Sequence, residues 1–406
     1  MHNSFILFCA LNAVKGMVIK MKILFTATVQ SHICQFHLPF IEMLKKQGHE
    51  VHVAAKNNLD LKPGLKLDIA DKVYDVPFER SPFSTQNIKA YKVLKKIMEE
   101  NQYGMVHCNT PMGGVVTRLA ANRKKTKVVY TAHGFHFFKG APLKNWLMYY
   151  PMEWVLAFKT DVLICINKED FALAKKHMHA KRVEYVHGVG VNERKIAPSA
   201  VSREEKRSEL KIPENAKVLF SIGELNENKN HEVIIKAVAK INNPDIHYMI
   251  AGNGDKEEYL NRLSASLGIQ DKVHLLGYKT DINELLQCSD VFCLPSKREG
   301  LSVALMEAAA AGLPVVCSDI RGNSDIIADC EGGYLCKPTD VDAFAEKISL
   351  LIGAEELCAK MSDTNKNNIK SFVLSSVSEE MRQIYFEQMA DPFKKNLIES
   401  SCLNNE

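Results

Sequence analysis

Short apolar runs alternate with longer stretches of helix-forming residues along most of the chain. In a first series, apolar runs predict strands at residues 22–29, 50–56, 105–110, 127–133, 162–167 and 182–187. A second series begins at Lys217 and predicts strands at residues 218–222, 247–251, 273–276, 291–294, 314–318 and 333–336. Strands separated by helices form parallel sheets with helices on both faces. The pattern therefore predicts an α/β protein with two doubly wound sheets.

The segments outside these two series set the expected domain boundaries. Residues 188–216 are rich in charge, contain two prolines and are the best linker candidate, and residues 372–389 predict an amphipathic helix. The apolar run at residues 4–14 is too short to span a bilayer and has no basic segment before it, which favours an N-terminal extension or a start at Met21 over a membrane anchor. The expected divisions are an extension (1–20), an N-terminal domain (21–190), a second domain (191–372), a helix that returns to the N-terminal domain (373–390) and a tail (391–406).

Length and cysteine content narrow the class of protein. A chain of 406 residues is too long for one core and fits two domains of ordinary size. Its eleven cysteines show no Cys-x-x-Cys pair and no metal-type spacing, so we expect reduced thiols, a cytoplasmic protein and no structural zinc.

Charge is divided unevenly between the two halves. Residues 21–190 carry 25 Lys and Arg against 14 Asp and Glu, whereas the chain after residue 190 carries 25 against 34. A basic half can attract nucleic acid, but no nucleic-acid-binding motif accompanies the charge. An anionic membrane surface that bears a diphospholipid acceptor fits better, and predicts a peripheral protein at the inner face of the cytoplasmic membrane.

Aromatic residues and lysines are interleaved between Phe135 and Lys159. Helices of this composition lie at lipid interfaces, with Lys139 and Lys144 near the headgroups. In the alternative interpretation Trp154 and Leu156 are core residues that pack on the sheet, and the sequence does not separate the two.

The segment from Ser296 to Val316 predicts a binding site. A strand ends near residue 295, and Glu299 follows in a loop, where it points into the crevice at the carboxyl ends of the strands. Glu307 lies about two turns along the next helix. Backbone N–H groups near Leu301 and Ser302 favour a phosphate, and Gly300 lets a ligand approach closely. Two carboxylates around an anion site suit a sugar nucleotide; the alternative is a solvated loop charge and an exposed helix residue.

Five segments in a fixed order carry a family resemblance: residues 221–237, 249–255, 273–278, the Glu299 segment and 317–327. In these segments the chain resembles the retaining glycosyltransferases of family 4. The resemblance implies the GT-B fold, in which two Rossmann-like domains face a central cleft. Residues 21–40 and 130–140 are typical of the bacterial exopolysaccharide and capsule enzymes of that family.

The resemblance implies roles for single residues. Lys229 would hold the donor diphosphate, Glu299 and His133 would contact the transferred sugar, and Glu307 would accept hydrogen bonds from the ribose. The donor side would further include Gly223, Gly252, Asn253, Gly254, Tyr278, Gly300, Leu301 and Ser302, and the acceptor side His32 and His37. Lys229 could instead be an exposed lysine, and His133 a histidine paired at the end of a strand.

One position departs from the family pattern. The family has a Gly-Arg-Leu triplet where this chain has Gly223-Glu224-Leu225, so the second cation beside Lys229 is missing. Either helix N–H groups or another basic residue such as Arg298 would replace it.

A metal requirement is not expected. The one Asp-x-Asp spacing, Asp340-Val341-Asp342, precedes a helix and predicts an N-cap and a first-turn acid. We expect no metal and no cofactor apart from the nucleotide sugar, which is a co-substrate.

The predicted reaction moves a hexosyl or N-acetylhexosaminyl group from a nucleotide diphosphate sugar, UDP-linked in the favoured interpretation, to a lipid-linked or growing glycan. The resemblance implies that the anomeric configuration is retained. Two alternatives stay open: an epimerase of GT-B shape that needs no acceptor, and a non-catalytic partner that binds a nucleotide sugar, for which Glu224 is the best argument.

Overall fold

The computed structural model describes residues 20–403 except 63, 194–195 and 197–198. The chain divides into two compact units. Of the described residues, unit 1 contains those up to Ile166, Asp170–Val186 and those from Ser378 onward, and unit 2 contains Asn167–Glu169 and His187–Val377. The apolar run at residues 4–14 lies outside the described residues. Within the described part, none of the helices combines the length and apolar character needed to cross a membrane.

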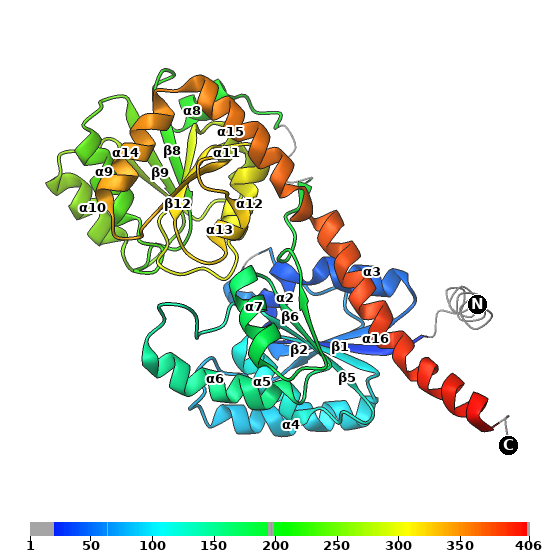
Figure 1. Ribbon diagram of the computed structural model, residues 1–406. Coiled ribbons are helices and arrows are strands. Elements are labelled where there is room, and N and C mark those ends of the chain that lie inside the picture. Colours follow the sequence, from blue (N-terminus) through cyan, green and yellow to red (C-terminus); the bar gives the residue numbers. More distant parts are fainter. Residues whose placement is uncertain (1–19, 63, 194–195, 197–198, 404–406) are drawn as a thin grey trace, which may run out of the picture. The chain divides into compact units, whose positions relative to one another are not determined.

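Unit 1 is built on a parallel sheet with strand order β3-β2-β1-β4-β5-β6-β7. The strands are β1 (Lys22–Val29), β2 (Glu50–Lys56), β3 (Lys72–Asp75), β4 (Met105–Asn109), β5 (Lys127–Ala132), β6 (Val162–Cys165) and β7 (Arg182–Tyr185). The intervening helices are α2 (Gln30–Phe36), α3 (Leu38–Lys46), the short η1 (Leu59–Leu61), α4 (Gln86–Asn101), α5 (Pro111–Ala120), α6 (Leu143–Ala157) and α7 (Lys168–His177). Figure 1 shows these helices around the sheet.

Unit 2 repeats this topology with strand order β10-β9-β8-β11-β12-β13. The strands are β8 (Lys217–Ile222), β9 (Ile246–Ala251), β10 (Val273–Gly277), β11 (Val291–Leu294), β12 (Val315–Ser318) and β13 (Gly333–Cys336). The helices are α8 (Arg203–Glu209), α9 (Glu232–Ile241), α10 (Glu257–Ser266), α11 (Ile282–Gln287), α12 (Val303–Ala310), α13 (Asn323–Ile326), α14 (Val341–Ile352), α15 (Glu355–Asn368) and the short η3 (Ile369–Ser371). Both sheets are parallel and doubly wound, so the predicted fold class is confirmed.

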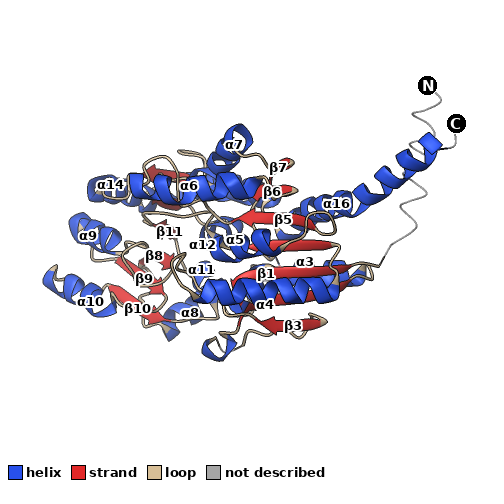
Figure 2. Ribbon diagram, turned by 90° about the horizontal axis from the view of Figure 1, so that it is seen from below, coloured by secondary structure: helices blue, strands red, loops and turns tan. Residues whose placement is uncertain are grey.

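Alternation along the strands of unit 2 creates two cores. Phe220 and Phe292 belong to one buried cluster, with residues of α11 and α12, whereas Leu219 and Val291 belong to another, with residues of α9 and α14. Successive side chains of a strand point to opposite faces. A continuous apolar strand therefore needs helices on both faces, as Figure 2 shows.

The last helix, α16 (Leu374–Leu403), packs on the sheet of unit 1. The Tyr385 hydroxyl lies 2.7 Å from Nδ1 of His107 on β4, and the ring of Tyr385 meets Phe25 of β1 edge-on. Glu387 also pairs with Arg182. The predicted return of this helix to the N-terminal domain therefore agrees with the contacts, but the helix runs beyond residue 390, where we expected a tail.

The linker prediction for residues 188–216 is wrong for its second half. Arg207 in α8 is buried, and its guanidinium donates to the Cys288 and Ala216 carbonyls and to Asp290. Ile212 is also buried in the core of unit 2. The charged Arg207, one of the residues that indicated a linker, instead forms hydrogen bonds and an ion pair that attach this segment to unit 2.

Strand β3 is the element that the sequence analysis missed. Its four residues, KVYD, are half-exposed or exposed because β3 lies at the edge of its sheet. Without a buried face, the segment has no apolar run to reveal it.

Candidate functional site

Each sheet has one point where the strand order reverses direction. It lies between β1 and β4 in unit 1 and between β8 and β11 in unit 2. Loops at the carboxyl ends of the strands diverge there, and ligands of open α/β sheets bind at this point. Most of the residues predicted for the site follow strands at or next to these two positions; Tyr278, which follows the edge strand β10, is an exception.

In unit 2, Lys229 and Glu299 come together across the reversal point. Lys229 follows β8 and Glu299 follows β11, and Lys229 Nζ lies 2.8 Å from Glu299 Oε1. Their side chains are 20% and 13% exposed. The alternatives of a solvated loop charge and an exposed lysine are therefore wrong for these two residues.

Asparagines hold the two loops that carry this ion pair. The Asn226 side chain accepts from Lys229 N at 2.9 Å, and Asn228 Nδ2 donates to the Arg298 carbonyl at 3.0 Å. Asn230, which has a positive φ of 58°, donates through Nδ2 to the carbonyls of Pro295 and Pro338. These bonds fix the backbone on both sides of the ion pair, so its geometry does not depend on surface side chains.

The glycines of this region allow close packing of backbones. A Cβ on Gly223 would lie 2.9 Å from Lys229 Cδ, so the lysine stem crosses directly over this glycine. A Cβ on Gly252 would lie 2.0 Å from the Gly223 carbonyl oxygen, and one on Gly254 would lie 2.3 Å from that of Leu225. The Gly252-Asn253-Gly254 turn is therefore required for loop packing, a reason separate from the predicted approach of a base.

Glu224 stands where the family has Arg. Its side chain is exposed and accepts from Asn226 Nδ2 at 3.0 Å. The expected substitute, Arg298, is exposed. Arg321 is the basic residue that the sequence analysis missed: it is half-buried, and its Nε donates to the Glu299 carbonyl at 3.4 Å. Its position within residues 317–327, a segment that carried the resemblance, was the available signal.

The loop of Arg321 also packs on the predicted phosphate-binding turn. A Cβ on Gly322, which has φ 81°, would lie 2.3 Å from the Gly300 carbonyl oxygen. Ser302 is the N-cap of α12, and its hydroxyl accepts from Leu305 N at 3.3 Å. The start of α12 is thus a capped helix end beside the loop of Glu299, and its binding of an anion stays a prediction.

For Glu307 and Tyr278, two residues predicted to bind the donor, the structure gives the position and exposure of the side chain. Glu307 lies in the second turn of α12 and is half-buried, and its contact with a ribose stays a prediction. Tyr278 follows β10 and is 75% exposed, so a base could stack on it without rearrangement of the core.

A cavity of about 170 Å³ lies beside the Lys229 loop, lined by Asn226, Glu227, Asn230, His231, Glu232, Lys256, Tyr259, Leu260 and Lys297. Pockets that enclose a ligand of drug size measure about 300–1,000 Å³. This cavity is too small to be the place of a nucleotide sugar.

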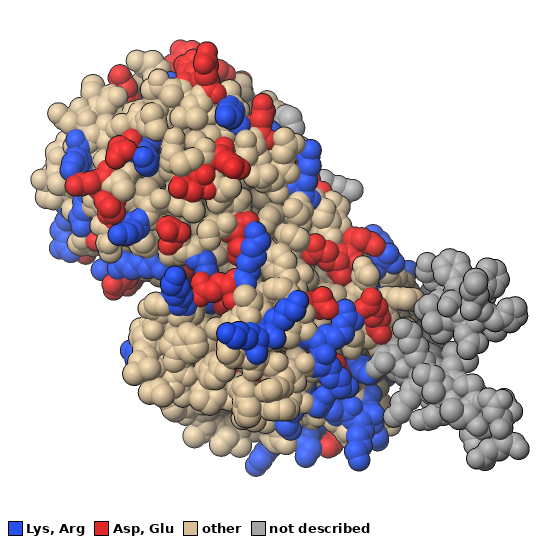
Figure 3. Space-filling view, in the orientation of Figure 1, with Lys and Arg blue, Asp and Glu red and all other residues tan. Residues whose placement is uncertain are grey.

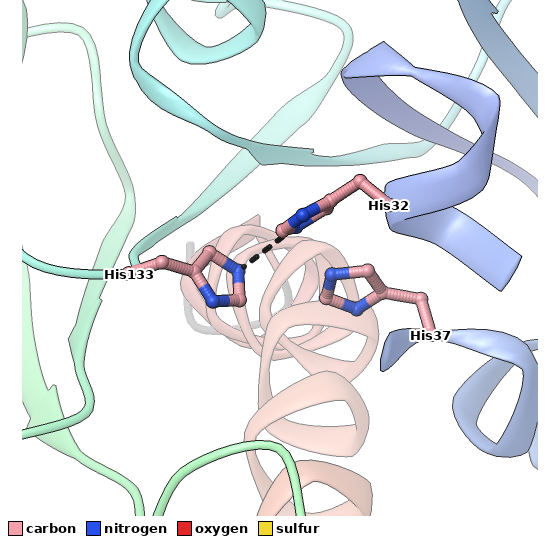
Figure 4. Close-up of side chains that lie close together, drawn as sticks. All are labelled: His32, His37 and His133. Atoms are coloured by element: carbon pink, nitrogen blue, oxygen red, sulfur yellow. Dashed lines mark hydrogen bonds between the residues drawn. The ribbon is translucent and has the colours of Figure 1, made fainter. Parts of the chain in front are cut away.

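In unit 1, the three predicted histidines form one cluster. His32 lies in α2, His37 lies between α2 and α3, and His133 directly follows β5. His32 Nε2 and His133 Nε2 are 3.4 Å apart. The centroid of the His37 ring lies 5.3 Å from the centroid of the His32 ring and 5.7 Å from that of the His133 ring. Figure 4 shows the three rings converging from different elements. The sequence named these residues singly, and the fold brings them together.

Burial keeps these imidazoles neutral. It lowers the pKa of His133 to about 4. For His32 and His37, burial and the neighbouring histidines hold the pKa well below the ordinary value. A neutral imidazole has a lone pair that can accept a hydrogen bond from a sugar hydroxyl or bind a metal.

Two buried residues of β4 that the sequence analysis missed adjoin the cluster. His107 has partners on both nitrogens, the Tyr385 hydroxyl at 2.7 Å and the Thr131 hydroxyl at 2.8 Å. Asn109 places Oδ1 3.3 Å from His133 Nε2. His133 is therefore paired at a strand end, as the alternative held, and also faces the cluster.

The Asp-x-Asp segment has the structural role that was predicted for it. Asp340 is the N-cap of α14 and accepts from Ala343 N at 2.9 Å, and Asp342 pairs with Lys240 at 2.5 Å.

Helix α6 divides the aromatic segment between core and surface. Leu156 is buried, as the core interpretation required. Leu143, Leu147, Trp154 and Val155 are exposed, and Lys139 and Lys144 are exposed beside them. The outer face of α6 is therefore an apolar surface flanked by lysines.

Comparisons with known proteins agree with this architecture. The family described as Glycosyl transferase 4-like matches residues 22–167, and the family described as Glycosyl transferases group 1 matches residues 202–368. EpsD of Bacillus subtilis (strain 168), assigned as a glycosyltransferase, is 41% identical over 375 residues, which cover 91% of this chain and 97% of EpsD. The UDP-Gal:alpha-D-GlcNAc-diphosphoundecaprenol alpha-1,3-galactosyltransferase of Escherichia coli is 26% identical over 89% of this chain and 95% of that protein.

Solved structures show the same fold. The crystal structure of Anabaena Alr3699/HepE in complex with UDP-glucose matches with a TM-score of 0.74 and 18% identity, and covers 90% of this chain and 100% of HepE. Together with the two doubly wound units and the EpsD match, these findings identify the chain as an enzyme that belongs to the family 4-like glycosyltransferases of the GT-B fold.

Proposed function

We propose that this glycosyltransferase moves a hexosyl or N-acetylhexosaminyl group from a UDP-sugar to a lipid-linked glycan in surface polysaccharide biosynthesis. The transfer retains the anomeric configuration and needs no metal ion. Two relatives support the substrates: HepE was crystallised with UDP-glucose, and the E. coli enzyme is named for transfer from UDP-galactose to a diphosphoundecaprenol-linked sugar.

The ion pair between Lys229 and Glu299 carries the proposal. A diphosphate that arrives beside β8 competes with Glu299 for the Lys229 ammonium, because phosphate oxygens carry more charge than a carboxylate. Glu299, once released, can accept hydrogen bonds from sugar hydroxyls. In this scheme the ion pair holds both side chains in place before the donor arrives, so little ordering is needed on binding.

The chemical step follows from this arrangement. The bond between the anomeric carbon and the UDP oxygen breaks, the acceptor oxygen bonds to the same face of that carbon, and the acceptor proton passes to the departing phosphate oxygen. Lys229 and the amides at the start of α12 stabilise the charge on the diphosphate. Glu299 and His133 orient the sugar, and Glu307 holds the ribose. The neutral His32 and His37 would lie toward the acceptor.

The outer face of α6 supports a membrane-bound acceptor. Leu143, Leu147 and Trp154 are exposed on this helix, and the lysines near its start can pair with anionic headgroups. Figure 3 also shows Lys and Arg side chains gathered over unit 1 on the face drawn. We propose that the outer face of α6 contacts the cytoplasmic leaflet while the lipid-linked acceptor is glycosylated.

Transfer by purified variants tests the proposal. The chain is incubated with UDP-sugars and a polyprenyl-diphosphate-linked acceptor sugar in detergent micelles, in buffer that contains EDTA. Lys229→Ala removes the charge that stabilises the leaving diphosphate, and kcat should fall by about 100- to 1,000-fold. Lys297→Ala is the matched control, because Lys297 is an exposed lysine of the facing loop and pairs with the exposed Glu227.

Three results would contradict the proposal. Undiminished transfer in both Lys229→Ala and Glu299→Ala would remove the ion pair from the mechanism. Loss of wild-type activity in EDTA and its return with magnesium would overturn metal independence. Formation of an epimer from the donor alone, or donor binding without turnover on any acceptor, would favour the epimerase or the non-catalytic partner.

A further inference from the structure

We propose that His32, His37 and His133 form a binding site for a divalent transition-metal ion of the zinc type. The inference concerns unit 1 alone, and the expected consequence for activity, given below, rests on the proposed function. Metal binding itself does not, because it can be measured without any substrate.

The positions of the ring nitrogens support such a site. Each histidine offers one nitrogen, and these three atoms lie within 4.8 Å of one another. Zinc binds histidine nitrogen at about 2.0–2.1 Å in tetrahedral sites, so two such ligands stand roughly 3.3–3.4 Å apart. His32 Nε2 and His133 Nε2 are already separated by 3.4 Å. A rotation of the His37 ring toward the other two would complete three ligands (Figure 4).

His37 provides an independent observation. Its side chain is 1% exposed, and among the described residues neither ring nitrogen has a hydrogen-bond partner. Buried polar atoms nearly always have a partner, so this imidazole requires an explanation. Neighbouring His107 is the useful contrast, because both of its nitrogens are hydrogen-bonded. A metal ion within the cluster would bond to His37 without any change at His107.

The chemistry of the cluster favours a metal over a proton. Zinc needs the neutral imidazole, and burial disfavours the protonated ring. Three nitrogen ligands with a fourth position left for water or another oxygen are a known zinc set. The Asn109 Oδ1, at 3.3 Å from His133 Nε2, now accepts from that nitrogen; when the metal binds, the ring proton moves to Nδ1 and the lone pair of Nε2 faces the ion.

Occupation of the site should inhibit transfer. In the proposed reaction His133 contacts the transferred sugar, and an Nε2 that is bound to a metal ion can neither donate to nor accept from a sugar hydroxyl. The ion would therefore be a reversible inhibitor and not a cofactor. Zinc should slow wild-type transfer, and EDTA should restore it.

Cobalt and zinc titrations of the full chain test the site. Metal-free protein is titrated with Co²⁺, whose visible absorption reports tetrahedral nitrogen ligands, and Zn²⁺ affinity is measured by competition with a coloured chelator. We expect one ion per chain in the wild type. His37→Gln and His32→Gln should each weaken zinc binding by about 100-fold, at least as much as the loss of a residue that supports a ligand. His179→Gln, a change at an exposed histidine, should bind as the wild type does.

The outcomes separate this inference from its rivals. Zinc should raise the thermal unfolding temperature of the wild type and of His179→Gln but not that of His37→Gln, because a ligand stabilises only the fold that binds it. If His37→Gln does not fold, the comparison rests on His32→Gln, whose ring is only half-buried. Equal zinc affinity in the wild type and His32→Gln overturns the site. Normal metal binding without inhibition of transfer would keep the site and contradict only the role of His133.

Discussion

At the carboxyl ends of the strands, unit 1 has three uncharged imidazoles, whereas unit 2 has the ion pair between Lys229 and Glu299. Unit 1 has its own ion pair elsewhere: Arg118 of α5 pairs with Glu153 of α6, and their side chains are 1% and 7% exposed. Both units also contain buried charge, so the difference between the two sites lies in their loops, with neutral rings in unit 1 and a charged pair in unit 2. Topology therefore determines the position of a site, whereas a few loop residues determine its chemistry.

The ion pair between Arg118 and Glu153 is part of a hydrogen-bond network. The guanidinium of Arg118 binds both carboxylate oxygens of Glu153, at 2.8 and 3.0 Å, and donates from Nε to the Gly114 carbonyl. The Tyr130 hydroxyl lies 3.3 Å from Glu153, and its ring lies under the guanidinium. Such a network stabilises only as a whole, because each member left alone is a buried charge.

The largest expected effect is on this network. Glu153→Gln leaves Arg118 with an uncompensated charge, and the free energy of unfolding of unit 1 should fall by about 3–5 kcal/mol. Both tryptophans of the chain, Trp146 and Trp154, lie in unit 1, so tryptophan fluorescence in urea reports this unit. Glu299→Gln is the matched control in unit 2, which has no tryptophan, so its unfolding is followed by far-UV circular dichroism, which reports the helices of both units. An equal loss of stability in both variants would erase the distinction between the two ion pairs.

A smaller effect is expected for the sugar contact of unit 1. His133→Ala should lower kcat/KM by roughly tenfold to 100-fold, the equivalent of about 1–3 kcal/mol for one buried hydrogen bond. His179→Ala, in the same unit, should keep full activity. Wild-type kinetics in His133→Ala would confine the catalytic role to unit 2.

Acid should weaken unit 1 through its buried histidines. The pKa of His133 is lowered to about 4 in the fold, so between pH 6.5 and 4 the unfolded chain binds a proton that the folded chain does not, and stability falls as the pH falls. From pH 7 to 5.5 this histidine alone should cost about 1 kcal/mol. Urea unfolding followed by tryptophan fluorescence at both pH values measures the loss, which should be smaller by that amount in His133→Gln. If the stability of the variant depended on pH as that of the wild type does, His133 would have to be protonated equally in the folded and unfolded states.

The last effect falls on membrane binding and not on stability, and it concerns the charge difference between the units. Replacing Lys139 and Lys144 by Glu should weaken binding to vesicles that contain anionic lipid by about 1 kcal/mol for each lost lysine. Flotation of vesicles with and without phosphatidylglycerol measures it, and unfolding in urea should be unchanged. Unaltered flotation of the double variant would place the membrane contact elsewhere.

The sequence by itself determined the two doubly wound sheets, because apolar runs of strand length separated by helices leave few other ways to bury both faces. It also placed three of the residues predicted for the site, since Lys229, Glu299 and His133 each lie in a segment that follows a predicted strand. Their roles, which the family resemblance implies, stay predictions. The linker prediction for residues 188–216 was wrong because the sequence does not distinguish charge that is paired inside a fold from charge in solvent. Strand β3 was missed because an edge strand has no apolar run.

Only the tertiary structure decided which residues meet. Lys229 and Glu299 are 70 residues apart, and His32 and His133 are 101 apart. The strands that precede Lys229 and Glu299, β8 and β11, are adjacent where the sheet order reverses, and those that precede His32 and His133, β1 and β5, are separated there by β4 alone, which no local pattern encodes. The same holds for Arg321, whose loop reaches Glu299 through the packing of Gly322 on Gly300. The chemistry of each residue was readable in the chain, but distance and burial, which set its charge and its partners, exist only in the fold.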